Sequence, residues 1–200
     1  MLINELKNYR IILGSRSPRR AQLLKDTGIR FELVHYHVKE KYPASLQGQD
    51  IAIYLAGQKS DAYPGNLGER DILITADTIV WCGNEVLHKP EKPSDAIRML
   101  NTISGKTHQV YTGVCIRTAA EKRVFCASTD VTFCELTGEE IRYYVEKYKP
   151  FDKAGAYGIQ EWIGYVGVER IEGSYFNVMG LPVHHLYLEL KDLLASKTQE

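Results

Sequence analysis

The stretch from Ile11 to Lys25 constrains the fold most strongly, because its character changes twice over a short distance. Residues 11–14 are an apolar run, residues 15–20 read Ser-Arg-Ser-Pro-Arg-Arg, and residues 21–25 have a helical pattern. Ser17 is a good helix N-cap, and Pro18 suits the first helical turn. The stretch therefore predicts a strand, a tight loop and a helix, the opening unit of an α/β fold.

Residues 15–20, called the anion loop below, concentrate groups that bind anions. A helix N-terminus presents free backbone N–H groups and the positive end of the helix dipole. Two serine hydroxyls and three arginines stand in the same segment. The pattern predicts a site for several phosphates, with a polyphosphate as the first ligand hypothesis. The segment by itself also fits a capped helix with solvated arginines, and that alternative stays open.

Size and charge exclude several classes of protein. The chain has 200 residues and a formal net charge of zero, which suits a single domain over residues 1–200 with a frayed tail at 195–200. A nucleic-acid binder usually carries a basic excess. No run approaches the ~20 apolar residues of a membrane span, and residues 1–10 lack an apolar signal core. We therefore expect a cytoplasmic protein that binds neither nucleic acid nor membrane.

Several common catalytic and metal-binding motifs are missing. The sequence has no G-x-S-x-G, P-loop or G-x-G-x-x-G motif, which argues against a serine hydrolase, a P-loop kinase and a Rossmann dehydrogenase. The four cysteines form no C-x-x-C pair and are expected to be reduced and buried. His35 and His37 could face one way from a strand, but no third metal ligand is evident.

The order of periodic segments predicts a mixed α/β domain. Strands are expected at 11–14, 31–35, 72–81, 86–88, 107–118, 123–135 and 162–171, and helices at 18–27, 51–62, 93–103, 139–147 and 181–194. Residues 149–160 read as a loop and residues 173–180 as a polar and aromatic turn. Long hairpins inserted into such an alternation suggest two lobes around a central cleft.

Two carboxylates and three lysines are candidates for chemistry. Asp77 follows the apolar run 72–76, a common place for a catalytic group in an open α/β sheet, although aspartate also simply ends strands. Glu40 is a candidate second carboxylate, since magnesium takes one or two protein carboxylates plus phosphate oxygens. Three lysines stand in loops or at the ends of elements and suit phosphate binding or ordinary surface exposure: Lys59, Lys89 and Lys153.

These pieces in this order resemble the Maf family of nucleoside triphosphate pyrophosphatases. The matching segments span nearly the whole chain: 15–20, Glu40, Lys59, 76–78, 89–90, 104–114, 152–160 and 173–182. The run Ala-Tyr-Gly-Ile-Gln at 156–160 is most similar to the branch that acts on dTTP and UTP. The resemblance implies an ITPase-like α/β fold of two lobes with a central nucleotide-binding cleft, and a homodimer.

The resemblance also implies an activity and a set of residue roles. The enzyme would hydrolyse dTTP and UTP to a nucleoside monophosphate and pyrophosphate, with magnesium or manganese held by Glu40 and Asp77. Asp77 would be the catalytic residue. The implied specificity residues are Arg19, Thr78 and Gln160, and the implied phosphate-binding residues are Ser15, Ser17, Arg20, Lys59, Lys89 and Lys153. The cellular role would be removal of modified nucleotides or division arrest. The alternative is a non-catalytic nucleotide-binding regulator of septum formation, but the presence of both carboxylates favours catalysis.

The chain departs from the family pattern at three positions. His88 precedes Lys89 where the family often has glycine, Lys149 precedes a proline where an acidic residue is frequent, and Glu161 follows Gln160 in place of glycine. None of these changes removes a proposed catalytic group. Glu161 adjoins the residue expected to read the base, and its carboxylate could accept a hydrogen bond from an exocyclic amine. That contact would move the preference toward CTP.

Overall fold

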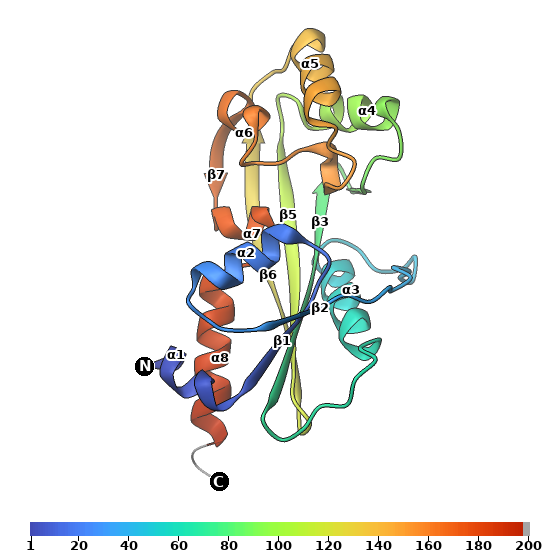
Figure 1. Cartoon of the computed structure of the whole chain (residues 1–200). Coiled ribbons are helices and arrows are strands. Elements are labelled where there is room, and N and C mark those ends of the chain that lie inside the picture. Colours follow the sequence, from blue (N-terminus) through green and yellow to red (C-terminus); the bar gives the residue numbers. More distant parts are fainter. Residues whose placement is uncertain (198–200) are drawn as a thin grey trace. The chain divides into compact units, whose positions relative to one another are not determined.

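The computed structural model describes residues 1–197, which contain a mixed sheet of seven strands (Figure 1). The strand order is β2-β1-β3-β5-β6-β7, and β4 pairs with β3. The strands are β1 (Arg10–Gly14), β2 (Glu32–Val34), β3 (Asp71–Cys82), β4 (Glu85–Leu87), β5 (Thr107–Arg117), β6 (Lys122–Phe133) and β7 (Val168–Glu172). The α/β class predicted from the sequence is confirmed.

The helices alternate with these strands along the chain. They are α1 (Leu2–Glu5), α2 (Pro18–Asp26), α3 (Gln49–Asp61), α4 (Pro93–Ile103), α5 (Gly138–Tyr148), α6 (Trp162–Gly167), α7 (Tyr175–Met179) and α8 (Val183–Lys197), with 3-10 turns η1 (Leu6–Asn8) and η2 (Ala154–Ala156). None of the helices within residues 1–197 is long and apolar enough to cross a bilayer.

The chain divides into two compact units. Unit 1 comprises residues 1–77, 112–127 and 180–200, and unit 2 comprises residues 78–111 and 128–179. Strands β3, β5 and β6 contribute residues to both units. The central cleft expected from the sequence stays a prediction.

In unit 1, strands β1, β2 and β3 are parallel. Ile12 of β1 lies opposite Glu32 of β2, and Gly14 at the end of β1 lies opposite Thr75 of β3. Parallel strands deliver the segments that follow them to the same edge of a sheet. Because Gly14 lies opposite Thr75, the anion loop that follows Gly14 begins beside the part of β3 that carries Asp77.

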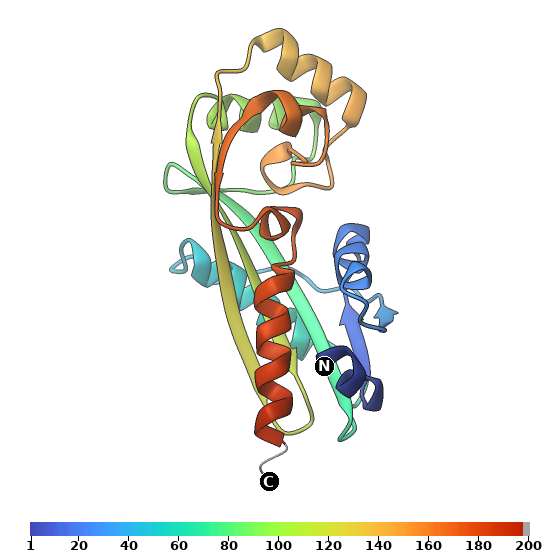
Figure 2. The same ribbon diagram turned by 90° about the vertical axis from the view of Figure 1, so that its left-hand side faces the viewer.

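Helices α3 and α8 cover opposite faces of the unit 1 part of the sheet (Figures 1 and 2). On the α3 face, the Thr75 hydroxyl donates a hydrogen bond of 2.8 Å to the carbonyl of Ala56. A Cβ at Gly113 of β5 would lie 2.2 Å from the carbonyl oxygen of Ala52, so only glycine permits this approach. These contacts fix α3 against the strands, and with it Lys59 near the end of the helix.

Unit 2 is built around a continuous apolar core. Helices α4 and α5 pack against each other (Figures 1 and 2), and their buried residues join those of β4, β5 and β6. Thr137 opens α5 with a capping box, as its spacing to Glu140 predicts. Gly83 and Asn84 both have positive φ, at 58° and 67°, in the two-residue turn that joins β3 to β4.

Two of the expected elements are wrong. The strand expected at 72–81 is present as β3, which runs past Asp77: its pairing with β1 stops at Thr75, and β4 pairs with residues 80–82. The strand expected at 162–171 is helix α6 followed by β7, and the turn expected at 173–180 contains helix α7. The aromatic and β-branched residues of 162–168 resemble a strand in composition, but tertiary packing decides the helix.

Two further observations concern the C-terminal part of the chain. At Gly164 of α6, a Cβ would lie 1.9 Å from the carbonyl oxygen of Ile159, so the helix approaches the preceding loop too closely for any side chain. Helix α8 continues through Lys197. Residues 195–197 of the expected frayed tail are therefore helical, and residues 198–200 lie outside the described residues.

Candidate functional site

The anion loop has the geometry expected of a capped helix start. The backbone N–H of Ser17 donates to the Ser15 hydroxyl oxygen at 3.1 Å, and the backbone N–H of Arg20 donates to the Ser17 hydroxyl oxygen at 3.4 Å. Ser15 is buried and Ser17 is half-buried. The two hydroxyls thus hold the loop in shape and keep the first turn of α2 at the edge of the sheet.

The three arginines of the anion loop have different surroundings. The Arg20 guanidinium donates from Nε to the carbonyl of Gly180 at 2.7 Å and from Nη1 to the carbonyl of Ala76 at 2.9 Å. Burial lowers the pKa of Arg20 from its usual value, and the negative charge of Asp77 opposes that shift. Arg19 is half-buried and Arg16 is exposed. Arg20 therefore joins β3 to the segment before α8 and stands in the electric field of Asp77.

The two candidate carboxylates meet at one lysine. Lys59 Nζ lies 2.8 Å from Glu40 Oε1 and also donates a short hydrogen bond to Asp77 Oδ1. Asp77 is buried, Lys59 is mostly buried, and the Glu40 side chain is 43% exposed. The structure therefore brings together three predicted residues from a loop, a helix and a strand. We call them the Lys59 cluster.

Tyr36 supports the Lys59 cluster, although sequence reasoning did not single it out. Its hydroxyl donates a hydrogen bond of 2.7 Å to the backbone carbonyl of Lys59, and burial raises its pKa to about 12. A Cβ at Gly14 would lie 2.6 Å from the Tyr36 hydroxyl oxygen, so the glycine before the anion loop makes room for this tyrosine. A tyrosine after an edge strand has no sequence signal of its own.

The donor set of the Lys59 cluster suits a hard divalent cation. Magnesium and manganese prefer carboxylate and phosphate oxygens, and Glu40 and Asp77 already converge on one positive group. Within residues 1–197, no three histidine, cysteine or acidic side chains gather as a metal site. A cation at this position would therefore need further oxygen ligands from a bound phosphate or from water, as well as from the two carboxylates.

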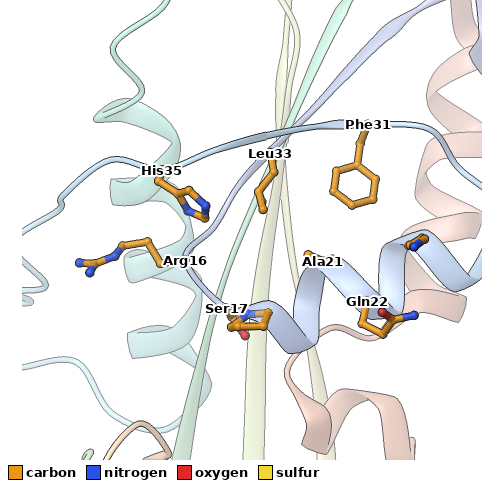
Figure 3. A pocket seen from close by; sticks show the side chains of 9 residues that line it. Arg16, Ser17, Ala21, Gln22, Phe31, Leu33 and His35 are labelled. Atoms are coloured by element: carbon orange, nitrogen blue, oxygen red, sulfur yellow. The ribbon is translucent and has the colours of Figure 1, made fainter.

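A pocket of about 340 Å³ lies on the outer side of the anion loop, between α2 and β2 (Figure 3). Arg16, Lys25 and His35 supply its basic groups. The remaining lining residues are Ser17, Pro18, Ala21, Gln22, Phe31 and Leu33, of which Phe31 and Leu33 provide the large apolar side chains. Arg16 and His35 thus belong to this pocket, and neither contributes to the Lys59 cluster.

In unit 2, the predicted phosphate-binding residue Lys153 contacts two carboxylates. Its ammonium lies 2.7 Å from Asp152 Oδ1 and 2.9 Å from Glu161 Oε1, and its side chain is only 9% exposed. The other oxygen of Glu161 accepts a short hydrogen bond from the hydroxyl of Tyr144. Sequence reasoning did not single out Tyr144, which lies inside the helix expected at 139–147.

The remaining predicted residues of unit 2 lie at three different places. Thr78 is half-buried in β3 directly after Asp77, Lys89 is exposed after β4, and Gln160 is half-buried at the end of the loop that begins at Lys149. Glu161, the residue that follows Gln160, contacts the Tyr144 hydroxyl and the Lys153 ammonium. The roles assigned to these residues from the family resemblance stay predictions.

Comparison with solved structures identifies the fold. The chain is similar to the Staphylococcus aureus Ham1 protein with a TM-score of 0.50 and 14% sequence identity, and the likeness covers 92% of this chain and 98% of that one. At this identity the likeness concerns the fold alone. It supports the ITPase-like α/β architecture expected from the sequence.

Comparison with known sequences identifies the family. The model of the Maf-like proteins matches residues 10–193. The chain is 52% identical to a Phocaeicola vulgatus protein and 53% identical to a Porphyromonas gingivalis protein, over 96% of this chain and 100% and 98% of theirs. A Flavobacterium johnsoniae protein is 48% identical over its whole length, and all three are named dTTP/UTP pyrophosphatase. This chain belongs to the Maf family.

Proposed function

We propose that this protein hydrolyses dTTP and UTP to the nucleoside monophosphate and pyrophosphate. The observation that carries the proposal is the Lys59 cluster, in which two carboxylates and an ammonium converge at the part of β3 beside which the anion loop begins. Relatives of about half-identical sequence, covered along nearly their entire length, bear the name of this activity.

The positive groups of unit 1 suit the triphosphate. A nucleoside triphosphate carries several negative charges that must be offset before a nucleophile can approach phosphorus. Arg19, the N-terminus of α2 and Lys59 would supply that compensation. Arg20 would act differently, because two of its N–H groups already bind backbone carbonyls and hold the surrounding segments in place.

Asp77 suits the role of general base. Its carboxylate is buried and lies in contact with Lys59, so its position is fixed. In the proposed reaction Asp77 accepts a proton from water, the water oxygen forms a bond to the α phosphorus, and the bond from that phosphorus to the bridging oxygen breaks. The electron pair leaves with pyrophosphate. Lys59 and Arg19 stabilise the charge that develops on the leaving group.

Glu40 and Asp77 would hold a magnesium or manganese ion. Their oxygens suit a hard cation, and Glu40 is exposed enough to reorient when a ligand enters. Such an ion, when bound, supplies charge neutralisation to the phosphate oxygens. Lys59 would then move from its contact with the carboxylates toward the phosphates, since one ammonium and one cation compete for the same two acids.

Base recognition is proposed for unit 2. Gln160 has an amide that both donates and accepts, which matches the O4 and N3–H edge of uracil and thymine. Thr78 would contact base or sugar, and Lys89 and Lys153 would contact phosphates. Acceptance of both dTTP and UTP requires tolerance of one methyl group, worth only ~1–3 kcal/mol to a pocket. The cytoplasmic location and the homodimer stay predictions of the sequence.

A substrate panel tests the proposal. The common ribo- and deoxyribonucleoside triphosphates are incubated with the purified chain and magnesium or manganese, and pyrophosphate and orthophosphate are measured separately. We expect pyrophosphate as the product, with dTTP and UTP as the preferred substrates. Release of orthophosphate, or equal rates for every base, would contradict the proposal. Tight nucleotide binding without any product would instead support the non-catalytic regulator.

A further inference from the structure

We infer that Glu161 is a positioning residue: together with Tyr144 and Lys153 it fixes the loop that carries Gln160, and it does not read the base. We call these three residues the Glu161 clamp. The consequence for substrate choice rests on the proposed function, in which Gln160 recognises uracil and thymine. The structural part of the inference stands on contacts inside unit 2 alone.

Both oxygens of the Glu161 carboxylate are engaged. Oε1 lies 2.9 Å from Lys153 Nζ, and Oε2 accepts a short hydrogen bond from the Tyr144 hydroxyl. The side chain is 22% exposed. To accept a hydrogen bond from the exocyclic amine of cytosine, the carboxylate would have to share or lose one of these partners. The contacts therefore favour an internal role over the CTP-directed role that the sequence left open.

Tyr144 connects the carboxylate to the backbone of the loop. The tyrosine is fully buried in α5 and stacks on Tyr148 with 5.1 Å between ring centroids. Its hydroxyl oxygen accepts a hydrogen bond of 3.0 Å from the backbone N–H of Gly158 while its proton goes to Glu161. Burial and the Glu161 hydrogen bond raise the pKa of Tyr144, so the phenol stays protonated at neutral pH and can make both bonds.

Gly158 shows how closely the loop closes on the clamp. A Cβ at this position would lie 2.8 Å from Glu161 Cδ and 2.9 Å from Lys153 Cε. The turn before it is conformationally demanding, since Gly155 and Ala156 both have positive φ, at 69° and 59°. A non-glycine residue in this region of φ is held there only by its surroundings. The Glu161 clamp supplies that support from the other end of the turn.

The clamp also holds the backbone that carries the Gln160 amide. An amide side chain can present its donor and acceptor in either order, so it separates uracil from cytosine only if its orientation is held. Gln160 is covalently attached to Glu161, and the backbone N–H of Glu161 donates to the carbonyl of Gly158 at 2.9 Å. Release of Glu161 would therefore free the backbone on both sides of the proposed base-reading residue.

The test compares four variants with the wild-type protein. Glu161→Ala removes the clamp, Glu161→Gln keeps an acceptor without the charge, and Tyr144→Phe removes the bridge to Gly158. Glu146→Ala, an exposed acid on the same helix as Tyr144, is the matched control. Amide hydrogen exchange is followed over residues 152–160, and kcat and KM are measured for dTTP, UTP and CTP.

We expect Glu161→Ala to accelerate exchange at Gly158, Ile159 and Gln160, to raise KM for dTTP and UTP by roughly tenfold and to leave kcat within about threefold. The preference for UTP over CTP should fall by roughly fivefold. Glu161→Gln should recover part of each effect, Tyr144→Phe should loosen mainly Gly158, and the Glu146 control should match the wild type.

Two results would overturn the inference. One is wild-type exchange and wild-type preference in Glu161→Ala. The other is a selective loss of CTP hydrolysis in Glu161→Ala with unchanged exchange, which would make Glu161 a base reader. Should Glu161→Ala not fold, the same comparison is made with Glu161→Gln and Tyr144→Phe. The hydrogen-exchange measurement does not require turnover. An inactive wild-type protein would therefore count against the proposed function, while the exchange data would still test the Glu161 clamp.

Discussion

Each unit holds one largely buried lysine between two carboxylates, and the two groups are built in opposite ways. In unit 1 the Lys59 cluster joins a loop, a helix and a strand through Glu40, Lys59 and Asp77. In unit 2 the corresponding group, called the Lys153 cluster, consists of Asp152, Lys153 and Glu161, which lie within ten positions of each other along the chain.

The two clusters differ in which member has the most buried side chain. In the Lys59 cluster a carboxylate, Asp77, is buried on a central strand, while Glu40 is accessible. In the Lys153 cluster the lysine is the buried member, and its acids hold it against the loop. A buried, rigid carboxylate suits proton abstraction, whereas a buried lysine with two acidic partners suits loop stabilisation. The two clusters contain the same kinds of charged group, and we expect one to serve catalysis and the other to stabilise a loop.

The largest effect is expected from the same chemical change made in both clusters. Asp77→Asn keeps the size of the side chain and removes its charge, so it should lower kcat for dTTP by about 10²–10⁴-fold with little change in KM. Glu161→Gln is the matched change in unit 2 and should leave kcat within about threefold. Steady-state kinetics of the two variants decide the comparison. Near-wild-type turnover in Asp77→Asn would remove Asp77 from the chemistry.

Replacing the lysine of each cluster with methionine should again give different effects on kcat and KM. Lys59→Met leaves Glu40 and Asp77 without their shared cation and removes a charge from the phosphate site, so kcat should fall by about 10²-fold. Lys153→Met should act mainly through KM, by roughly tenfold, because it loosens the loop and removes a proposed phosphate contact. The measurement is kcat and KM for dTTP in both variants. Equal effects on kcat would mean that both clusters serve the same step.

Replacement of Arg19 and replacement of Arg16, both in the anion loop of unit 1, should affect kcat/KM differently. Arg19→Ala should lower kcat/KM for dTTP by roughly 10–100-fold, through the loss of a charge-assisted phosphate contact. Arg16→Ala should change it less than about threefold, because Arg16 is exposed and lines the pocket between α2 and β2. Small and equal effects would support the alternative of a capped helix with solvated arginines.

The smallest effect concerns the pH dependence of stability in unit 2. His108 is fully buried, its Nε2 lies 2.8 Å from the Tyr157 hydroxyl, and its Nδ1 has no hydrogen-bond partner among the described residues. Burial lowers the pKa of His108 to about 4. The unfolded chain, with an ordinary value near 6.5, therefore binds the proton first as the pH falls.

The contribution of neutral, buried His108 to the free energy of unfolding is fully present above about pH 6.5 and is lost as the pH falls toward 4. Between pH 7 and pH 5 the loss should be about 2 kcal/mol in the free energy of unfolding. Urea unfolding of the wild type and of His108→Gln at the two pH values measures it. The variant should be less sensitive to pH by about that amount, and parallel losses in both proteins would contradict the assignment.

Local patterns in the sequence determined most of the elements and several of the site residues. The strand, capped loop and helix at residues 10–26 are present as predicted, since Ser17 and Pro18 act through the backbone next to them. The capping box at Thr137 is a local device of the same kind. The family resemblance carried Glu40, Lys59 and Asp77 onto the chain by position, and the structure shows that the three are in contact.

Only the tertiary structure decided which partners these residues have. The sequence places Asp77 directly after an apolar run, but its partner Lys59 comes from helix α3 and is found only in the folded chain. The residues of 162–167 have the composition of a strand but form a helix, in which Gly164 packs directly on the backbone of Ile159. Glu161 reads as a free charge beside Gln160, and its contacts with Tyr144 and Lys153 appear only in the folded loop. Caps and turns are set by near neighbours, whereas burial and ion pairing depend on residues that the chain brings together from a distance.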